Sequence, residues 1–340
     1  MNFCTSFADI PKQISERLDK APVFYSESYE KNVLLRGQSV IYVWSDSRIL
    51  FARVRKELFL KAALLECEPY LYNSEICEDE KSFLDEAMRT LKKTGVQWTI
   101  TTNTARFQAY PNRARTILSG NHIIDLSLSE EELWARVHSK HRNSIRRGEK
   151  AEMLLDIGGV ELVERYTPLA NETYARSGQS ETPASYYRAV IEGLDGQSLI
   201  MLLSKEGELQ AGGMFLYSDA AAYYLHGASI GRPEPGSTNF LLWRTIMLMK
   251  EKGVKEFSFV GYHVGAEEGS KLDGIQKFKE RFGGRLESCY SFKFIQSRAF
   301  YGLYCLAMRI RSKKPFKKYQ DAIDEQLDRY PELNGKEDKK

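Results

Sequence analysis

The chain has 340 residues, of which 42% are hydrophobic, and it carries 49 lysines and arginines against 46 aspartates and glutamates. This length suggests about two domains of roughly 150 residues each, with ordinary globular cores. A net charge of only +3 argues against a dedicated nucleic-acid-binding protein, whose domains usually carry a large basic surplus.

The cysteines and the lack of long apolar runs exclude further classes of protein. The five cysteines are odd in number and widely spaced, which indicates neither a disulfide framework nor a zinc site, so we expect no bound metal. The first 20 residues are charged, and no apolar run approaches the roughly 18 residues that span a bilayer. We therefore expect a cytoplasmic protein.

The first third of the chain is predicted to form a strand meander followed by a helix. Apolar runs cut by turn residues predict antiparallel strands within 32–59, at 33–35, 40–44 and 49–54. The spacing of apolar residues then predicts a helix over 80–94, which Gly95 should end. A further strand is expected at 96–100.

The middle of the chain is predicted to be mainly helical. A strand at 121–128 leads to Ser129, which forms a capping-box pattern with Glu132, so a helix should begin there. Two more helices are predicted at 160–175 and 184–194.

The last part predicts a mixed sheet. Its expected order is strands at 198–204, 209–217 and 220–230, a helix at 239–252, a strand at 254–260, a helix at 274–282 and a strand at 286–295. A meander that continues through a helical crossover builds a mixed sheet covered by helices. Because the first third has a similar order, we expect an α/β fold, an α+β mixed sheet, made of two similar halves.

Three stretches carry a resemblance to a known family. They are 126–134 with the basic segment 140–147, 222–229 leading to 239–243, and 274–284, which has the form Phe-Lys-x-x-Phe-Gly. They resemble the FemAB family, and the element order is similar to the acetyltransferase fold called GNAT. The resemblance implies two GNAT-like halves in tandem, over 1–125 and 126–298, followed by a basic helical tail over 299–340 with a disordered end.

The resemblance also implies a function. FemAB enzymes take an aminoacyl group from a charged tRNA and join it to an amine of a peptidoglycan precursor, so the expected partners are tRNA and a muropeptide or another cell-envelope precursor. Relatives in polysaccharide pathways leave open an N-acyltransferase that acts on a sugar of a surface glycan with coenzyme A or another donor. A third possibility is a non-catalytic homologue that only binds its partner.

The loop 231–237 bears on the donor. Ordinary GNAT enzymes hold the pyrophosphate of coenzyme A on free N–H groups at a helix N-terminus. Here Pro233 and Pro235 remove two N–H donors, and Glu234 adds a negative charge. We therefore expect no tightly bound cofactor, and a charged tRNA as donor in preference to acetyl-coenzyme A.

The resemblance implies that Lys279 and Phe278 belong to the active site. A fixed cation can stabilise the negative charge that develops on a carbonyl oxygen during acyl transfer. The pattern alone instead favours a solvated lysine on a helix whose buried face contains Phe278 and Phe282.

His226 is the third catalytic candidate. It lies two residues after Tyr224 in a predicted strand, so we expect the two side chains to share one face and to orient or deprotonate the acceptor amine. A single histidine in a sheet is more often structural.

Several further residues are candidates for substrate binding. Arg142 and Arg146 are four apart on a helix and, with Arg147, can clamp a phosphate or simply form a solvated basic face. The remaining candidates are Arg176, Asn239 and Tyr262.

The tail has an apolar block at 300–308 followed by six cations between 309 and 318. This pattern is typical of an interfacial helix near anionic lipid. We therefore predict that segment 300–318 makes peripheral contact with the membrane. The alternative is a docked C-terminal helix with a soluble basic end.

Overall fold

The structure, a computed structural model, describes residues 1–194, 196–263, 268–311 and 320–329. Of Tyr262 and His263 only the backbone is described. The predicted disordered end at 334–340 and most of the lysine-rich part of the tail lie outside the described residues.

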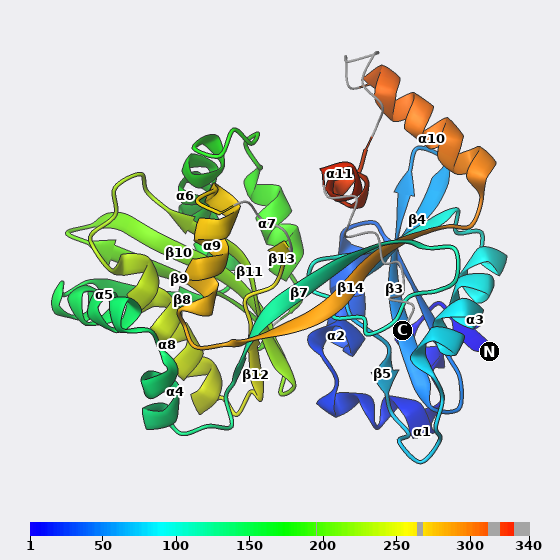
Figure 1. The fold of residues 1–340 in the computed structure, drawn as a ribbon, viewed down its shortest axis with the longest axis horizontal. Coiled ribbons are helices and arrows are strands. Elements are labelled where there is room, and N and C mark those ends of the chain that lie inside the picture. Colours follow the sequence, from blue (N-terminus) through cyan, green and yellow to red (C-terminus); the bar gives the residue numbers. More distant parts are fainter. Residues whose placement is uncertain (195, 264–267, 312–319, 330–340) are drawn as a thin grey trace.

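The strands form one mixed sheet that runs through the whole molecule (Figure 1). The first half contains β1 (Asn2–Cys4), β2 (Ser39–Trp44), β3 (Arg48–Glu57), β4 (Leu60–Leu65), β5 (Tyr70–Leu71), β6 (Trp98–Thr101) and β7 (Arg115–Asp125). The second half contains β8 (Leu154–Gly158), β9 (Ser198–Lys205), β10 (Glu208–Tyr217), β11 (Ala221–Ser229), β12 (Glu256–Ser258), β13 (Tyr262–His263) and β14 (Arg285–Ile295). Their order in space is β1-β2-β3-β4-β6-β14-β7-β12-β11-β10-β9-β8, with β5 beside β3 and β13 beside β7.

Helices cover both faces of this sheet (Figure 1). The first half contains α1 (Lys12–Ser15), α2 (Glu27–Leu35) and α3 (Glu80–Lys93). The second half contains α4 (Glu130–Arg136), α5 (Ser139–Lys150), α6 (Val163–Ala175), α7 (Ala184–Ile191), α8 (Ser237–Glu251) and α9 (Lys271–Glu280), and the tail contains α10 (Arg298–Arg311) and α11 (Ala322–Arg329). No helix of the described residues is both long and apolar enough to cross a membrane.

The two halves repeat one plan, which confirms the predicted fold class. In the first half the antiparallel meander β2-β3-β4 continues through α3 to β6, which pairs parallel with β4. In the second half the meander β9-β10-β11 continues through α8 to β12, which pairs parallel with β11. Both crossovers are the expected result of a helix that carries the chain back across a sheet.

Two long strands join the halves. β7 pairs with β12 near its end and with β14 along most of its length. The last residues of β14 pair with β6, so the final strand of the second half also extends the sheet of the first half. The halves therefore share backbone hydrogen bonds as well as side-chain contacts.

One hydrophobic core belongs to both halves. It packs Tyr25 and Phe51 of the first half together with Tyr166, Tyr187 and Tyr223 of the second, and each of these side chains is nearly or fully buried. On the opposite face of the sheet, α3 covers the first half, while α4, α5 and α8 cover the second. A cavity in the shared core can therefore have walls from both halves.

The predicted strand at 33–35 is wrong, because these residues end helix α2. The hydroxyl of Ser26 accepts a hydrogen bond from the Tyr29 N–H and so caps the helix. Tyr29 and Val33 are four apart and both buried. The cap and this buried pair outweigh the strand preference of a three-residue apolar run.

Candidate active site between the two halves

Gly283, just after α9, packs closely against the end of α4 and so fixes the direction of α9. Gly283 has a φ of 84°, and a Cβ there would lie 2.7 Å from the backbone of Arg136 at the end of α4. A glycine is therefore required for α9 to end against α4. At the other end Ser270 caps α9 by accepting from the Asp273 N–H. Lys279 lies on the last turn of this fixed helix.

Lys279 reaches from α9 to the turn after β12. Its Nζ donates to the carbonyl oxygens of Val260 and Gly261, the second at 2.8 Å. Among the described residues no carboxylate pairs with this ammonium, and burial lowers the pKa of Lys279 to about 8. Near neutral pH Lys279 is thus mostly a cation that neutral carbonyl groups hold in place.

The turn that Lys279 holds is strained and connects the two halves. Val260 has a φ of 40° and Gly261 a φ of 56°. A positive φ is an outlier for a β-branched residue, and such strain concentrates at functional sites. The Gly261 N–H donates to the Asn103 carbonyl of the first half at 3.1 Å, and the Phe259 N–H donates to the His122 carbonyl of β7 at 3.0 Å.

Asn103 also lines a cavity of about 220 Å³ between the halves. The first half contributes Phe24, Tyr29, Arg36, Arg53, Glu66 and residues 102–104 to its walls. The second half contributes Tyr186, Val190, Leu216, Leu225 and His226. A cavity of this volume is large enough for a group the size of an amino acid.

An ion pair stiffens the first-half wall of this cavity. Arg53 donates two hydrogen bonds to the Glu66 carboxylate, at 2.7 and 3.0 Å, and the Tyr29 hydroxyl donates a third at 2.6 Å. Burial alone would raise the pKa of Glu66, but the Arg53 charge and its hydrogen bonds lower it. Both charges are therefore permanent near neutral pH, and they largely neutralise each other.

Arg36 is a second cation in the cavity wall. Its guanidinium donates to the Asn32 side chain and lies 5.7 Å from the centre of the Tyr29 ring. Among the described residues it forms no ion pair, which leaves its charge available to an anionic group of a ligand.

His226 faces the cavity as a neutral imidazole. Burial lowers its pKa to about 4. Its Nδ1 lies 3.0 Å from the Tyr174 hydroxyl, and its ring contacts the edges of Tyr186 and Tyr187. Within the described residues no hydrogen bond is formed by Nε2, so this nitrogen can interact with a bound group.

The prediction that Tyr224 and His226 share one face is wrong. A β-bulge in the pairing of β10 with β11 sets Met214 opposite His226 but Phe215 opposite Tyr224, so that Leu225 is the extra residue. Tyr224 stacks on Phe215 in the core on the opposite face, at 5.2 Å. One extra residue reverses the alternation on which the prediction depended.

Phe278 lies beside Lys279 in sequence but points away from it. Its ring packs against His141 of α5 at 5.1 Å and against Phe282 at 5.4 Å. The His141 Nε2 lies 2.9 Å from the Phe278 carbonyl oxygen. These contacts position α9 on α5.

The three arginines of α5 do not line the cavity. Arg142 donates to the carbonyl oxygens at the end of α4, the shortest bond being 2.6 Å to Val137. The Arg146 guanidinium lies 5.4 Å from the centre of the Trp134 ring, and Arg147 is exposed. This basic group therefore lies at the corner between α4 and α5.

The remaining candidates occupy other positions. Arg176 pairs with Glu172 at 2.9 Å and donates to the Ser229 carbonyl at 2.7 Å, which ties α6 to the end of β11. Asn239 lies in the first turn of α8, where its buried Nδ2 has no partner within the described residues. The side chain of Tyr262 lies outside the described residues.

Sequence reasoning missed most of the first-half wall and His122. His122 is 4% exposed, and both burial and the nearby Lys279 charge lower its pKa. A signal was available for Glu66, because it directly follows the apolar strand β4, and for Asn103, which follows β6. Polar residues at strand ends often form sites.

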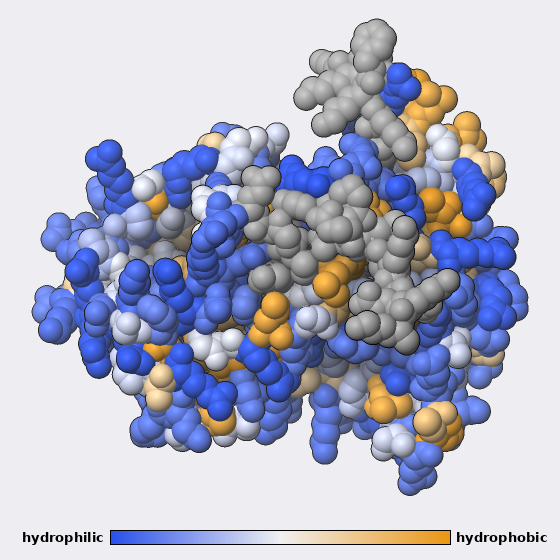
Figure 2. Space-filling model, in the orientation of Figure 1, coloured by the Kyte–Doolittle hydropathy of each residue, from blue (hydrophilic) through white to orange (hydrophobic). Residues whose placement is uncertain are grey.

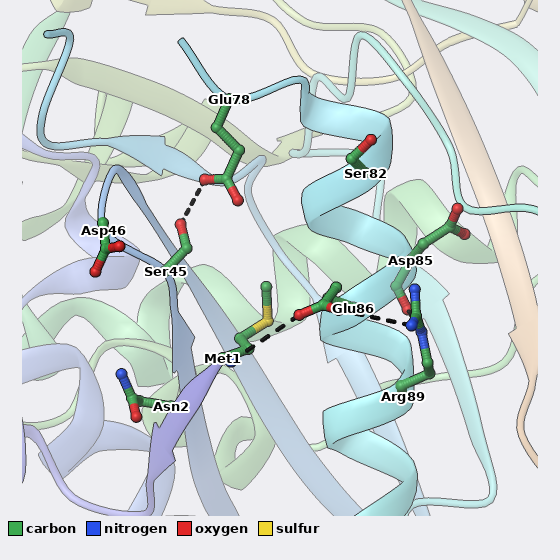
Figure 3. A pocket seen from close by; sticks show the side chains of 9 residues that line it. All are labelled: Met1, Asn2, Ser45, Asp46, Glu78, Ser82, Asp85, Glu86 and Arg89. Atoms are coloured by element: carbon green, nitrogen blue, oxygen red, sulfur yellow. Dashed lines mark hydrogen bonds and ion pairs between the residues drawn. The ribbon is translucent and has the colours of Figure 1, made fainter. Parts of the chain in front are cut away.

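A larger hollow of about 470 Å³ lies in the first half alone (Figure 3). Two of its acidic side chains already have partners: Ser45 donates to Glu78 at 2.5 Å, and Arg89 pairs with Glu86 at 3.6 Å. No residue of the second half lines it. We assign the candidate site to the cavity between the halves, where groups from both converge.

Comparison with solved structures shows the fold. No family model and no curated protein matches the sequence. FemX superposes with a TM-score of 0.67 at 14% identity, over 89% of this chain and 99% of that chain. The chain has the fold of FemX.

Two other structures share the FemX-like fold. The C-terminal domain of a putative lysylphosphatidylglycerol synthetase from Agrobacterium fabrum has a TM-score of 0.54 at 14% identity and covers 90% of this chain and 98% of its own. A tandem GNAT protein from the clavulanic acid biosynthesis pathway has a TM-score of 0.51 at 11% identity, over 87% and 98%. The two GNAT-like halves predicted from the sequence are thus confirmed.

Proposed function

We propose that the protein is an acyltransferase that moves an aminoacyl group from a charged tRNA to an amine of a cell-envelope precursor. The observation that carries the proposal is Lys279, a half-buried cation that pairs with no carboxylate of the described residues, at a strained turn beside a cavity shared by both halves. The FemX-like fold and the sequence resemblance to the FemAB family support this choice of reaction.

The proposed step follows from the groups present. The acceptor nitrogen attacks the ester carbonyl carbon, a C–N bond forms, the C–O bond to the tRNA ribose breaks, and the ribose oxygen leaves with a proton. Negative charge develops on the carbonyl oxygen. The Lys279 ammonium, already desolvated and held in position, would stabilise that charge without reorganisation.

Residues that line the cavity would orient the two reactants. Neutral His226, held by the Tyr174 hydroxyl, would hydrogen-bond the acceptor amine through Nε2. Arg36 would bind an anionic group of the acceptor. Phe278, Arg142, Arg146 and Arg176 would act through the packing of α9, α5 and α6. Arg147, which is exposed, stays a predicted substrate contact, as do Asn239 and Tyr262.

The start of α8 supports a donor other than coenzyme A in the second half. Gly236 has a φ of 94°, and a Cβ there would lie 2.1 Å from the Ser144 carbonyl oxygen of α5. The Ser237 N–H already donates to the Glu234 carbonyl at 3.0 Å. Glu234 in turn pairs with Lys205 at 2.8 Å. This loop is folded onto its own protein neighbours, which disfavours an open pyrophosphate cradle.

The name of one structural neighbour supports aminoacyl transfer as the reaction class. A lysylphosphatidylglycerol synthetase joins an amino acid to a lipid, and its C-terminal domain has the same fold. We propose a muropeptide as the first acceptor to test, with a sugar amine of a surface glycan as the second.

The test is calorimetric binding of the purified protein to charged tRNA, uncharged tRNA and acetyl-coenzyme A at physiological salt. We expect tighter binding of the charged form than of the uncharged form, and weaker binding by the Lys279→Ala variant. Binding of acetyl-coenzyme A alone would contradict the proposed donor and favour an N-acyltransferase acting on a sugar. Binding of none of the three would favour a non-catalytic homologue.

A further inference from the structure

Helix α10 uses only one of its faces to pack on the protein. Tyr301 and Tyr304 are buried against Trp98 of β6, and their ring centres lie 5.5 and 4.5 Å, respectively, from the centre of the Trp98 ring. Leu60 and Ala62 of β4 complete this small core. These contacts fix the orientation of α10 about its axis.

The opposite face of α10 is apolar and exposed. Leu303, Leu306 and Ile310 are three and four residues apart, so they lie on one side of the helix, and they are 51%, 52% and 71% exposed. Phe300 extends this face and is 44% exposed. Apolar side chains gather over α10 at the upper right of Figure 2. A stripe of this kind usually marks a binding surface.

Cations flank the stripe, and α10 contains no acidic residue. At 100° per residue, Arg298 and Arg309 fall on one flank of the stripe and Arg311 on the other. This arrangement lets long basic side chains reach outward beside an apolar face, as in helices that lie in a membrane interface.

The neighbouring hairpin extends the same surface. The turn between β3 and β4 exposes Leu58 and Phe59, which are 54% and 74% exposed. Lys56 and Lys61 flank this turn as a cross-strand pair and are both exposed. The turn leads into β4, whose first residue packs under α10.

A basic hollow adjoins the first turn of α10. It has a volume of about 640 Å³ and is lined by Arg298 together with Arg89 and Lys92 of α3 and Arg113. Apolar and basic side chains therefore lie together at one end of the molecule, as binding to the surface of an anionic bilayer requires.

We infer that α10 and the β3–β4 turn bind the surface of an anionic lipid bilayer. The stripe of α10 enters the boundary between headgroups and acyl chains, and the flanking cations bind the lipid phosphates. The helix lies along the surface and does not cross it. This inference is independent of the proposed acyl transfer.

The test is flotation of the full chain with vesicles of phosphatidylglycerol and phosphatidylcholine, compared with vesicles of phosphatidylcholine alone. We expect binding to the anionic vesicles only, weakened by salt. The double variant Leu303→Glu and Leu306→Glu should bind at least about tenfold more weakly. Leu154→Glu with Ile157→Glu is the matched control, because these residues of β8 are 68% and 52% exposed at the far edge of the sheet.

The other outcomes would overturn the inference. The α10 variant could float like the wild type, or the wild type could bind neither vesicle. A wild-type dimer that becomes a monomer in the α10 variant, seen by sedimentation velocity without vesicles, would make the stripe an interface between copies. Unchanged circular dichroism and thermal melting of the variant exclude loss of folding as the cause of weaker binding.

Discussion

The two halves repeat one strand plan but present different chemistry to the cavity between them. The first half contributes Arg53 and Glu66, two buried charges that neutralise each other. The second half contributes His226, a neutral imidazole whose Nε2 forms no hydrogen bond within the described residues. It also places Lys279, a cation held by carbonyl groups, at the turn that contacts Asn103 of the cavity wall. The repeated fold therefore does not mean repeated function.

The difference indicates a division of labour. Paired charges hold a wall in shape, because removing one partner leaves the other buried and uncompensated. Groups with lowered pKa values and no counter-ion are those that can change their interactions when a substrate arrives. We therefore expect changes to the Arg53–Glu66 pair to affect mainly stability, and changes to Lys279 and His226 to affect mainly transfer.

The largest expected effect is on stability. Glu66→Gln leaves the Arg53 charge buried without its partner and should lower the free energy of unfolding by about 3–5 kcal/mol. Urea denaturation measures this loss. Glu164→Gln is the control, because Glu164 is exposed and pairs with exposed Arg188, a kind of pair worth about 0–1 kcal/mol. Equal losses in the two variants would contradict a structural role for the first-half pair.

The Arg53–Glu66 pair also makes the stability of the fold depend on pH in the acid range. The folded-state pKa of Glu66 is lowered from the ordinary 4.5, so its stabilising contribution is complete above that value and is lost as the pH falls through the folded-state value. The acid-induced loss of stability should therefore be smaller in Glu66→Gln than in the wild type.

Lys279 should show a linkage of the same sign at alkaline pH. Its folded-state pKa of about 8 lies below the ordinary 10.5, so the folded protein binds fewer protons between these values and its stability rises with pH across them. At 1.36 kcal/mol per pKa unit the rise is at most ~3 kcal/mol. Comparing wild type with Lys279→Met between pH 8 and 10.5 measures it. An equal pH slope in both proteins would show that the ammonium is not desolvated.

Gly283, which follows α9, tests how closely α9 approaches α4. Gly283→Ala would bring a methyl group to 2.7 Å from the Arg136 backbone and should destabilise the fold by roughly 1–3 kcal/mol. Gly274→Ala in the same helix meets nothing within 4 Å and should stabilise by about 0.5–1 kcal/mol. Two thermal melts decide between these outcomes, and equal shifts in both variants would contradict the close approach of α9 to α4.

The smallest expected effect is at His226. His226→Gln should lower the transfer rate about tenfold, equivalent to ~1.4 kcal/mol, by loss of orientation. Because the pKa of His226 is about 4, the rate of the wild type should show no histidine titration between about pH 5.5 and 7. A pH–rate profile with a step near 6.5 that disappears in the variant would contradict the neutral, buried imidazole.

Much of the second half could be predicted from the sequence, because its signals are local. The capping box of Ser129 and Glu132 and the meander before α8 each follow from residues close together in the chain. The resemblance to the FemAB family also pointed to Lys279, but not to the carbonyl groups that hold it.

What could not be predicted depends on contacts between distant segments. The cavity joins Arg36, Glu66 and Asn103 to His226, and no local pattern links these residues. The bulge at Leu225 reverses the face of His226, and alternation alone gives no sign of it.

The most direct test of the account is aminoacyl transfer by Lys279→Ala compared with Lys277→Ala. Lys277 lies on the same helix, but it is 46% exposed and pairs with Asp273 at 2.8 Å. The donor is labelled aminoacyl-tRNA and the acceptor is a muropeptide precursor. We expect the transfer rate of Lys279→Ala to fall by a factor of about 10²–10³, and that of Lys277→Ala to equal the wild-type rate. Equal rates in the two folded variants would contradict the role of Lys279 and, with it, the assignment of the chemistry to the second half.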